Sequence, residues 1–233
     1  INDDFVAQAK FLQGEHVRWA LGRTCQISDV VLTVSYPLMD QLSEWTSPVL
    51  FLPWADSPYI APDLEAERNA VFLWAHIDRR IDFELLDAAA KARPNYAFHI
   101  VGPVAADVQA SLDRLVSDNA NVVAVPSKKL NELPLSSFFA SIIPYKKHVK
   151  DIEAVTLSNK SFQLMSRGFP LVTHGMPHFY GSDAIFKSQN LTDFCSALDS
   201  AHNRFEALQP VISSLMTENQ LDSRYRAFVD CLG

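Results

Sequence analysis

The stretch NKSFQLMSRGFPLVTHG, residues 159–175, places a lysine and a glutamine where their side chains can bind one anionic ligand together. Its apolar spacing predicts a short helix that ends at Gly168, and the run LVT after it predicts a buried strand. Lys160 falls in the first turn of that helix, where the helix dipole already attracts negative charge. Because a cation at this end opposes the dipole, we expect an anion such as a nucleotide diphosphate to compensate it. The simpler alternative is a surface lysine at the start of an ordinary helix.

The polar residues around Lys160 can contribute to the same site. Gln163 lies one turn later on the same helix face and can both donate to and accept from ribose hydroxyl groups. The remaining candidates, which offer hydroxyl, amide and backbone N–H groups, are Ser158, Asn159 and Ser161. Ser158 or Asn159 would equally serve as the N-cap of the helix, and Gln163 would equally be a solvated helix residue.

From residue 71 onward, short apolar runs alternate with amphipathic stretches. Strands are predicted at 71–75, 96–101, 121–125, 138–143 and 171–173, and helices at 82–93, 107–117, 159–167, 194–205, 208–216 and 221–232. Strands that are apolar throughout and alternate with helices are typical of a parallel sheet covered on both faces. The sequence therefore predicts an α/β fold, a Rossmann-like doubly wound parallel sheet.

Ligands of such sheets bind beyond the carboxyl ends of the strands. Polar candidates follow the predicted strands there, and they are His76, Arg79, Arg80, Tyr145 and Glu153. Neither GxGxxG nor GxxxxGK[ST] occurs in the chain, which disfavours a dinucleotide oxidoreductase and a P-loop NTPase. His174 and His178 flank Gly175 beyond the last strand, but no third ligand is spaced to form a metal site with them.

Composition excludes several other classes of protein. The 233 residues carry a net charge of −7 and no basic stripe, which argues against binding of nucleic acid. Three distant cysteines form no CxxC pair, so we expect neither a zinc site nor a disulfide framework, and a reducing compartment is favoured. No apolar run approaches the roughly 18–20 residues of a membrane span.

The order of the motifs resembles the donor-binding half of GT-B glycosyltransferases. The motifs are VFLWAHIDRRIDFELL, FHIVGP, NVVAVPSKKLNELP, SIIPYKK and NKSFQLMSRGFPLVT, all within residues 71–173, and the resemblance covers residues 48 to about 205. Three positions depart from the family pattern. The ribose-binding glutamate falls on Gln163, its partner acid falls on Val155, and the glycine that ends the first strand is replaced by Ala75 and His76. A Lys-x-x-Gln version of this helix resembles, more loosely, the xanthan-type glucuronosyltransferases.

The resemblance implies a division of the chain into two parts. Residues 5–24, 29–36 and 37–45 read as a helix, a strand and a helix, and they look like the end of an acceptor-binding half. We therefore expect residues 1–47 to be a remnant of that half, with a hinge near Ser47 and Pro48, and residues 48–233 to bind the donor with C-terminal helices. The chain begins without Met, so we expect a fragment.

The resemblance also implies an activity, namely metal-independent transfer of a sugar from a nucleotide sugar, preferably a UDP-sugar, to a glycan or lipid-linked acceptor in polysaccharide biosynthesis. Arg79 or Arg80 would meet the diphosphate, His76 the phosphate or sugar, and Tyr145 and Glu153 the sugar. The general base is expected outside this chain, whose own catalytic residues are unknown. No cofactor is expected, and the location is expected to be cytoplasmic, with a peripheral membrane contact through the missing half. Alternatives are a non-catalytic Rossmann-like nucleotide-sugar binding module and a GT-B-type nucleotide-sugar epimerase.

Overall fold

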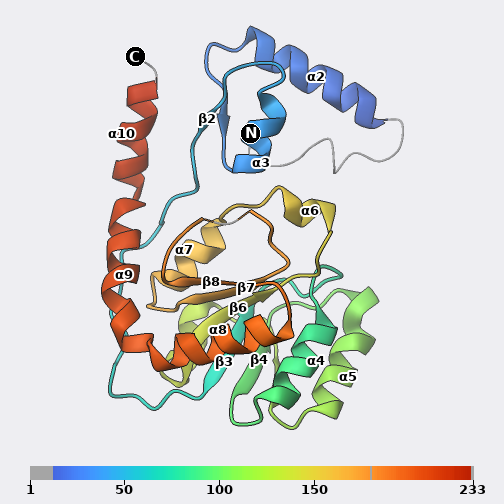
Figure 1. Cartoon of the computed structure of the whole chain (residues 1–233), viewed down its shortest axis with the longest axis vertical. Helices are drawn as coiled ribbons and strands as arrows, with labels where there is room; N and C mark the ends of the chain where they lie inside the picture. Colours follow the sequence, from blue (N-terminus) through green and yellow to red (C-terminus); the bar gives the residue numbers. More distant parts are fainter. Residues whose placement is uncertain (1–12, 179, 232–233) are drawn as a thin grey trace.

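The computed structural model describes residues 13–178 and 180–231 (Figure 1). The first part of the helix expected over 5–24 lies outside the described residues. Its described part belongs to α2, Gln13–Ile27, and is followed by β1, Leu32–Thr33, α3, Tyr36–Leu42, and β2, Val49–Leu50. The strand expected over 29–36 is shorter than predicted because Ser35 caps α3, its side chain accepting from the Leu38 backbone N–H.

A six-stranded parallel sheet forms the centre of the remaining chain. Its strands are β3, Ala70–Trp74, β4, Ala97–Val101, β5, Val122–Val125, β6, Phe138–Pro144, β7, Leu171–His174, and β8, Ile185–Ser188. They are arranged in the order β5-β4-β3-β6-β7-β8, and every neighbouring pair is parallel. The chain thus moves in one direction from β3 to β5 and in the other from β6 to β8. The predicted doubly wound sheet is confirmed, although the last strand, β8, was not predicted.

Helices cover both faces of this sheet (Figure 1). One face carries α4, Phe83–Ala92, α5, Gln109–Asp118, and α8, Leu191–Asn203, and the other carries α7, Asn159–Met165. A short helix α6, Lys150–Glu153, precedes α7, and α9, Phe205–Glu218, and α10, Leu221–Cys231, complete the chain. No helix in the described part is long and apolar enough to cross a membrane.

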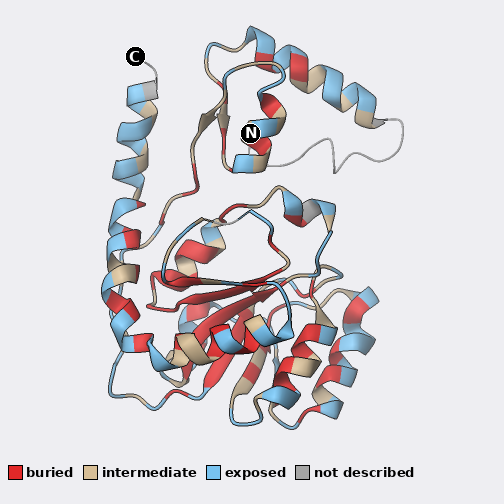
Figure 2. Ribbon diagram, viewed as in Figure 1, coloured by how far each residue is buried: buried red, intermediate tan, exposed pale blue. Residues whose placement is uncertain are grey.

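The strands of the sheet are largely buried, as the red ribbon of Figure 2 shows, and aromatic side chains pack at the centre of the core. The ring of Phe72 on β3 lies 4.6 Å from that of Phe138 and 5.0 Å from that of Phe169, measured between centroids. All three are fully buried, and burial of each contributes roughly 1.5–3 kcal/mol to folding. This packing sets the strands rigidly, and the strand ends in turn set the loops described below.

The N-terminal elements form a separate small sheet. β1 pairs with β2 in parallel, with Leu32 opposite Val49, and neither strand joins the six-stranded sheet. Cys25 of α2, Val31 before β1 and Leu42 of α3 form a second apolar cluster. β2 follows the expected boundary at residue 48 yet pairs with a strand that precedes it. The division of the chain at that residue stays a prediction.

Candidate functional site

The loop after β3 depends on a glycine that belongs to the neighbouring strand. Gly102 follows β4 with φ +145, and a Cβ atom there would lie 1.7 Å from the Ala75 carbonyl oxygen. Only glycine allows so close an approach. The sequence lacks the family's glycine at the end of the first strand. The backbone at Ala75 is nevertheless approached closely, because the residue that approaches it, Gly102, has no side chain.

The loops after β3, β6 and β7 are joined to one another by backbone contacts. The Lys146 N–H donates to the Arg80 carbonyl at 2.8 Å, and the Tyr145 N–H donates to the His174 carbonyl at 3.1 Å. Gly175, with φ +72, would bring a Cβ atom to 2.1 Å from the Tyr145 carbonyl oxygen. These contacts gather three segments that are distant in the sequence at the carboxyl edge of the sheet, where ligands of such folds bind.

The carboxylate of Asp78 fixes the side chain of Arg80 at the carboxyl edge of the sheet. The Arg80 Nη2 atom lies 2.6 Å from Asp78 Oδ2, and Arg80 Nε lies 3.0 Å from both carboxylate oxygens. Burial alone would raise the pKa of Asp78, but hydrogen bonds and charge from Arg80 outweigh it and lower the pKa to about 2. His76 Nδ1 lies 3.4 Å from the same carboxylate. Asp78 is therefore a carboxylate at neutral pH, and it orients the guanidinium.

Lys160 from α7 lies close enough to Arg80 for the two charges to act on each other. Burial lowers the pKa of Lys160, the positive charge of Arg80 lowers it further, and Asp78 raises it in part. The Arg80 guanidinium carbon is also 5.8 Å from the centroid of the Tyr145 ring, and burial raises the pKa of Tyr145. We name Asp78, Arg80, Tyr145 and Lys160 the edge cluster. It holds two cations and one carboxylate.

The start of α7 has the geometry of a capped helix. Ser158 Oγ accepts from the Ser161 N–H at 3.3 Å and lies 3.1 Å from the Ser161 hydroxyl, which is buried. The structure therefore gives these serines a capping role, and any contact with a ligand stays a prediction. Gly168, with φ +81, provides the left-handed turn expected after the helix. Phe162 and Met165 are fully buried, so α7 turns its apolar face inward.

The remaining predicted site residues lie around the edge cluster. Gln163 is half-buried on α7, whereas His76, Arg79, Asn159 and Glu153 are exposed, with Glu153 at the end of α6. No described contact joins Glu153 or Asn159 to the edge cluster. None of these positions is tested as a ligand contact, so all stay predictions. Within the described residues, no group of three His, Cys, Asp or Glu side chains is placed to hold a metal ion.

The sequence interpretation missed the role of Asp78. Asp78 was not among the predicted site residues, although the Asp-x-Arg spacing was visible in HIDRR. Such a spacing allows the aspartate to accept from the backbone N–H two residues later, here Arg80 N at 2.9 Å, while its second oxygen meets the side chain. That local turn would have distinguished Arg80 from Arg79.

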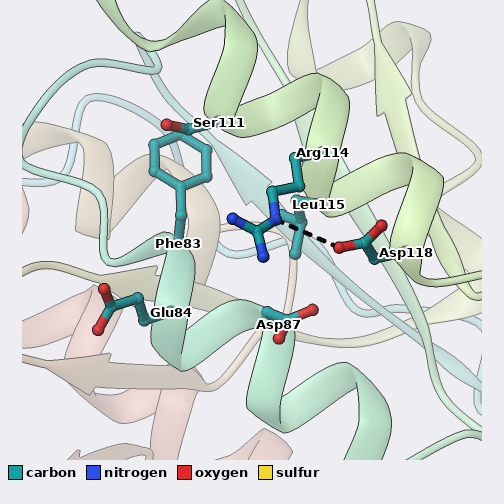
Figure 3. A pocket seen from close by; sticks show the side chains of 7 residues that line it. All are labelled: Phe83, Glu84, Asp87, Ser111, Arg114, Leu115 and Asp118. Carbon is teal, nitrogen blue, oxygen red and sulfur yellow. Dashed lines mark hydrogen bonds and ion pairs between the residues drawn. The ribbon is translucent and has the colours of Figure 1, made fainter.

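A hollow of about 330 Å³ lies between α4 and α5 and is shown in Figure 3. Its charged lining consists of Glu84, Asp87, Asp118 and Arg114, with Arg114 Nε 3.4 Å from an Asp118 oxygen. Three carboxylates against one guanidinium repel a phosphate group. The hollow is therefore a poor site for the anion that the edge cluster would attract.

No protein-family model and no curated protein sequence matches this chain. Solved structures do match it, and they include glycosyltransferases of the GT-B type. Anabaena HepE, solved with UDP and glucose, has a TM-score of 0.71 at 10% identity and covers 100% of this chain and 70% of its own. The pneumococcal O-GlcNAc transferase GtfA, solved with UDP and GlcNAc, has a TM-score of 0.64 at 11% identity over 91% of this chain and 46% of its own.

Staphylococcal TarM (S. aureus), solved with Fondaparinux, alpha-GlcNAc-glycerol and UDP, has a TM-score of 0.63 at 12% identity. It covers 98% of this chain and 48% of its own, so the present chain spans about half the length of GtfA and TarM. At these identities the likeness shows a shared fold. The resemblance to the GT-B fold that the sequence predicted is confirmed.

Proposed function

We propose that this chain is the donor-binding part of a glycosyltransferase that takes a nucleotide sugar, with a UDP-sugar preferred, and transfers its sugar to a glycan or lipid-linked acceptor. The observation that carries the proposal is the proximity of Arg80 and Lys160 at the carboxyl edge of a GT-B fold. Structures of similar fold contain UDP, which makes a nucleoside diphosphate the first candidate for the anion.

The chemistry of transfer explains the need for these cations. When the bond between sugar and diphosphate breaks, negative charge develops on the leaving diphosphate, and fixed positive groups lower the barrier by stabilising it. Arg80 is oriented by Asp78 through two-pronged hydrogen bonding, and Lys160 is half-buried, so neither side chain must reorganise greatly. A bound diphosphate would also relieve the repulsion between the two cations.

We further propose that binding needs no divalent metal ion and no cofactor, because two protein cations can take the place of a metal on the diphosphate. The general base would come from outside this chain. The edge cluster contributes leaving-group stabilisation and donor positioning, and the acceptor is bound by other parts of the protein.

Calorimetric titration of the chain with UDP, GDP and ADP, each with and without EDTA, tests this proposal. We expect UDP to bind most tightly and its affinity to be unchanged by EDTA. Affinity that disappears in EDTA would contradict metal independence, and no binding of any nucleotide would contradict the function itself. UDP binding by a full-length protein that transfers no sugar to any acceptor would favour the non-catalytic binding module.

A further inference from the structure

His174 is a buried polar residue that the proposed function has not used. It is the last residue of β7 and is only 5% exposed, at the same edge of the sheet as the edge cluster. Its carbonyl accepts from the Tyr145 N–H at 3.1 Å, so its backbone adjoins a member of that cluster. Its ring lies edge-on to Phe194 of α8, with 6.4 Å between centroids and 86° between planes.

The hydrogen bonds of the ring identify its tautomer. Ser188 Oγ lies 2.8 Å from the Thr173 carbonyl oxygen and 3.0 Å from His174 Nδ1. A carbonyl oxygen only accepts, so the single hydroxyl proton of Ser188 goes to Thr173. The hydroxyl must then accept from His174, and the proton of the imidazole is on Nδ1.

The other ring nitrogen is an acceptor without an internal partner. Burial lowers the pKa of His174. Asp82 at the start of α4 raises it, Lys147 in the loop after β6 lowers it, and a hydrogen bond to the Ser188 backbone and the charge of Asp193 on α8 raise it in part. With the pKa lowered overall, the ring is neutral at pH 7 and Nε2 carries a lone pair. Among the described residues, Nε2 has no hydrogen-bond partner. In the described part of the chain, the fully enclosed side-chain atoms without a partner are Thr33 Oγ1 and Arg68 Nε, so His174 Nε2 retains access to solvent.

The chemistry of Nε2 selects the kind of group that it can bind. A lone pair repels phosphate oxygens and requires an O–H or N–H donor. A nucleotide sugar carries hydroxyl groups on its ribose and on its sugar. Gln163, expected at the ribose, is on α7, whereas His174 adjoins Tyr145 and its ring packs against α8 on the other face of the sheet. The sugar is therefore the better match.

We propose that His174 is a positioning residue for the donor, in which Nε2 accepts a hydrogen bond from a hydroxyl group of the transferred sugar. The inference rests on the proposed function. Ser188 and the Thr173 carbonyl hold the ring in the tautomer that this contact needs, so Thr173, His174 and Ser188 act together at the ends of β7 and β8.

His174→Asn tests the assignment, because the asparagine amide can still donate to Ser188 while no acceptor remains at the position of Nε2. The probes are UDP and whichever of UDP-glucose, UDP-galactose, UDP-N-acetylglucosamine and UDP-glucuronate the wild type binds most tightly. We expect the variant to bind UDP as the wild type does and the UDP-sugar about 3- to 10-fold more weakly, the loss of one neutral hydrogen bond.

Two further results separate the possible failures. Absence of UDP binding by the wild type would overturn the proposed function and this inference with it, whereas equal UDP-sugar affinities in both proteins would overturn the His174 assignment alone. Imidazole ¹⁵N resonances of the wild type provide a readout that needs no variant. We expect Nδ1 to be protonated and Nε2 to shift with the UDP-sugar but not with UDP, and a protonated Nε2 or an Nε2 resonance unmoved by the sugar would also refute the assignment.

Discussion

Replacing Lys160 with alanine should separate ligand binding from folding. The lysine is half-buried and lies beside Arg80, and burial and that positive charge both lower its pKa. In the absence of ligand, the folded protein therefore gains little from this charge. In the complex, the ammonium group would donate to a phosphate oxygen, and a charge-assisted hydrogen bond contributes roughly 1.5–3 kcal/mol.

The proximity of Arg80 places the expected loss in the lower part of that range. Without Lys160, Arg80 is relieved of a neighbouring positive charge and can meet the diphosphate more fully, which offsets part of the loss. We expect Lys160→Ala to weaken UDP binding by about 1.5–2 kcal/mol, or roughly 10- to 30-fold in Kd. The melting temperature without ligand should be unchanged or slightly higher.

Calorimetry with UDP and thermal unfolding with and without UDP measure both quantities in the same samples. Lys160→Met keeps most of the side-chain length and separates the effect of charge from that of packing. Lys91→Ala is the matched control, since Lys91 on α4 is exposed and pairs with Asp87 away from the edge cluster. An unchanged UDP affinity together with a lower melting temperature in Lys160→Ala would show that the lysine is structural and would refute the site.

Two other variants test neighbouring groups. Gln163→Ala should cost about 0.5–1.5 kcal/mol and weaken uridine and UDP alike by calorimetry; a loss confined to UDP would contradict a ribose contact. Asp78, with its pKa lowered from 3.8 to about 2, stabilises the fold above pH ~4, and this contribution of about 2 kcal/mol is lost as the pH falls through 2. Urea unfolding between pH 5 and pH 2 should therefore show a steeper loss of stability in the wild type than in Asp78→Asn, and parallel curves would refute the pairing with Arg80.

Much of the fold could be predicted from the sequence, because the patterns that encode it are local. Near-continuous apolar runs such as 71–75 and 138–143 bury all of their side chains only in a sheet that is covered on both faces. Gly168 after a short amphipathic run predicted where α7 ends, and it adopts φ +81 there. β8 escaped prediction because its four residues, IFKS, include a charged and a polar side chain and show no clear period.

Less of the candidate site than of the fold could be predicted from the sequence, because the residues of the site are distant from one another along the chain. The residue types at 159–163 predicted an anion site by themselves, but they could not show that the charge of Arg80 acts on Lys160. Two backbone features fix the position of Arg80, namely the turn in which Asp78 accepts from the Arg80 N–H and the hydrogen bond from the Lys146 N–H to the Arg80 carbonyl, between the loops after β3 and β6.

The same distinction applies to His174 and Gly102. A sequence shows a histidine after a strand, but only the packing of β8 beside β7 brings Ser188 to its Nδ1 atom and so determines which nitrogen is free. Likewise, the close approach at Ala75 is permitted by Gly102, which lies in another loop. Secondary structure follows from neighbours along the chain. Charge pairs, tautomers and close backbone approaches depend instead on which loops lie side by side. The order of the strands determines those neighbours, and it is fixed only when the core packs.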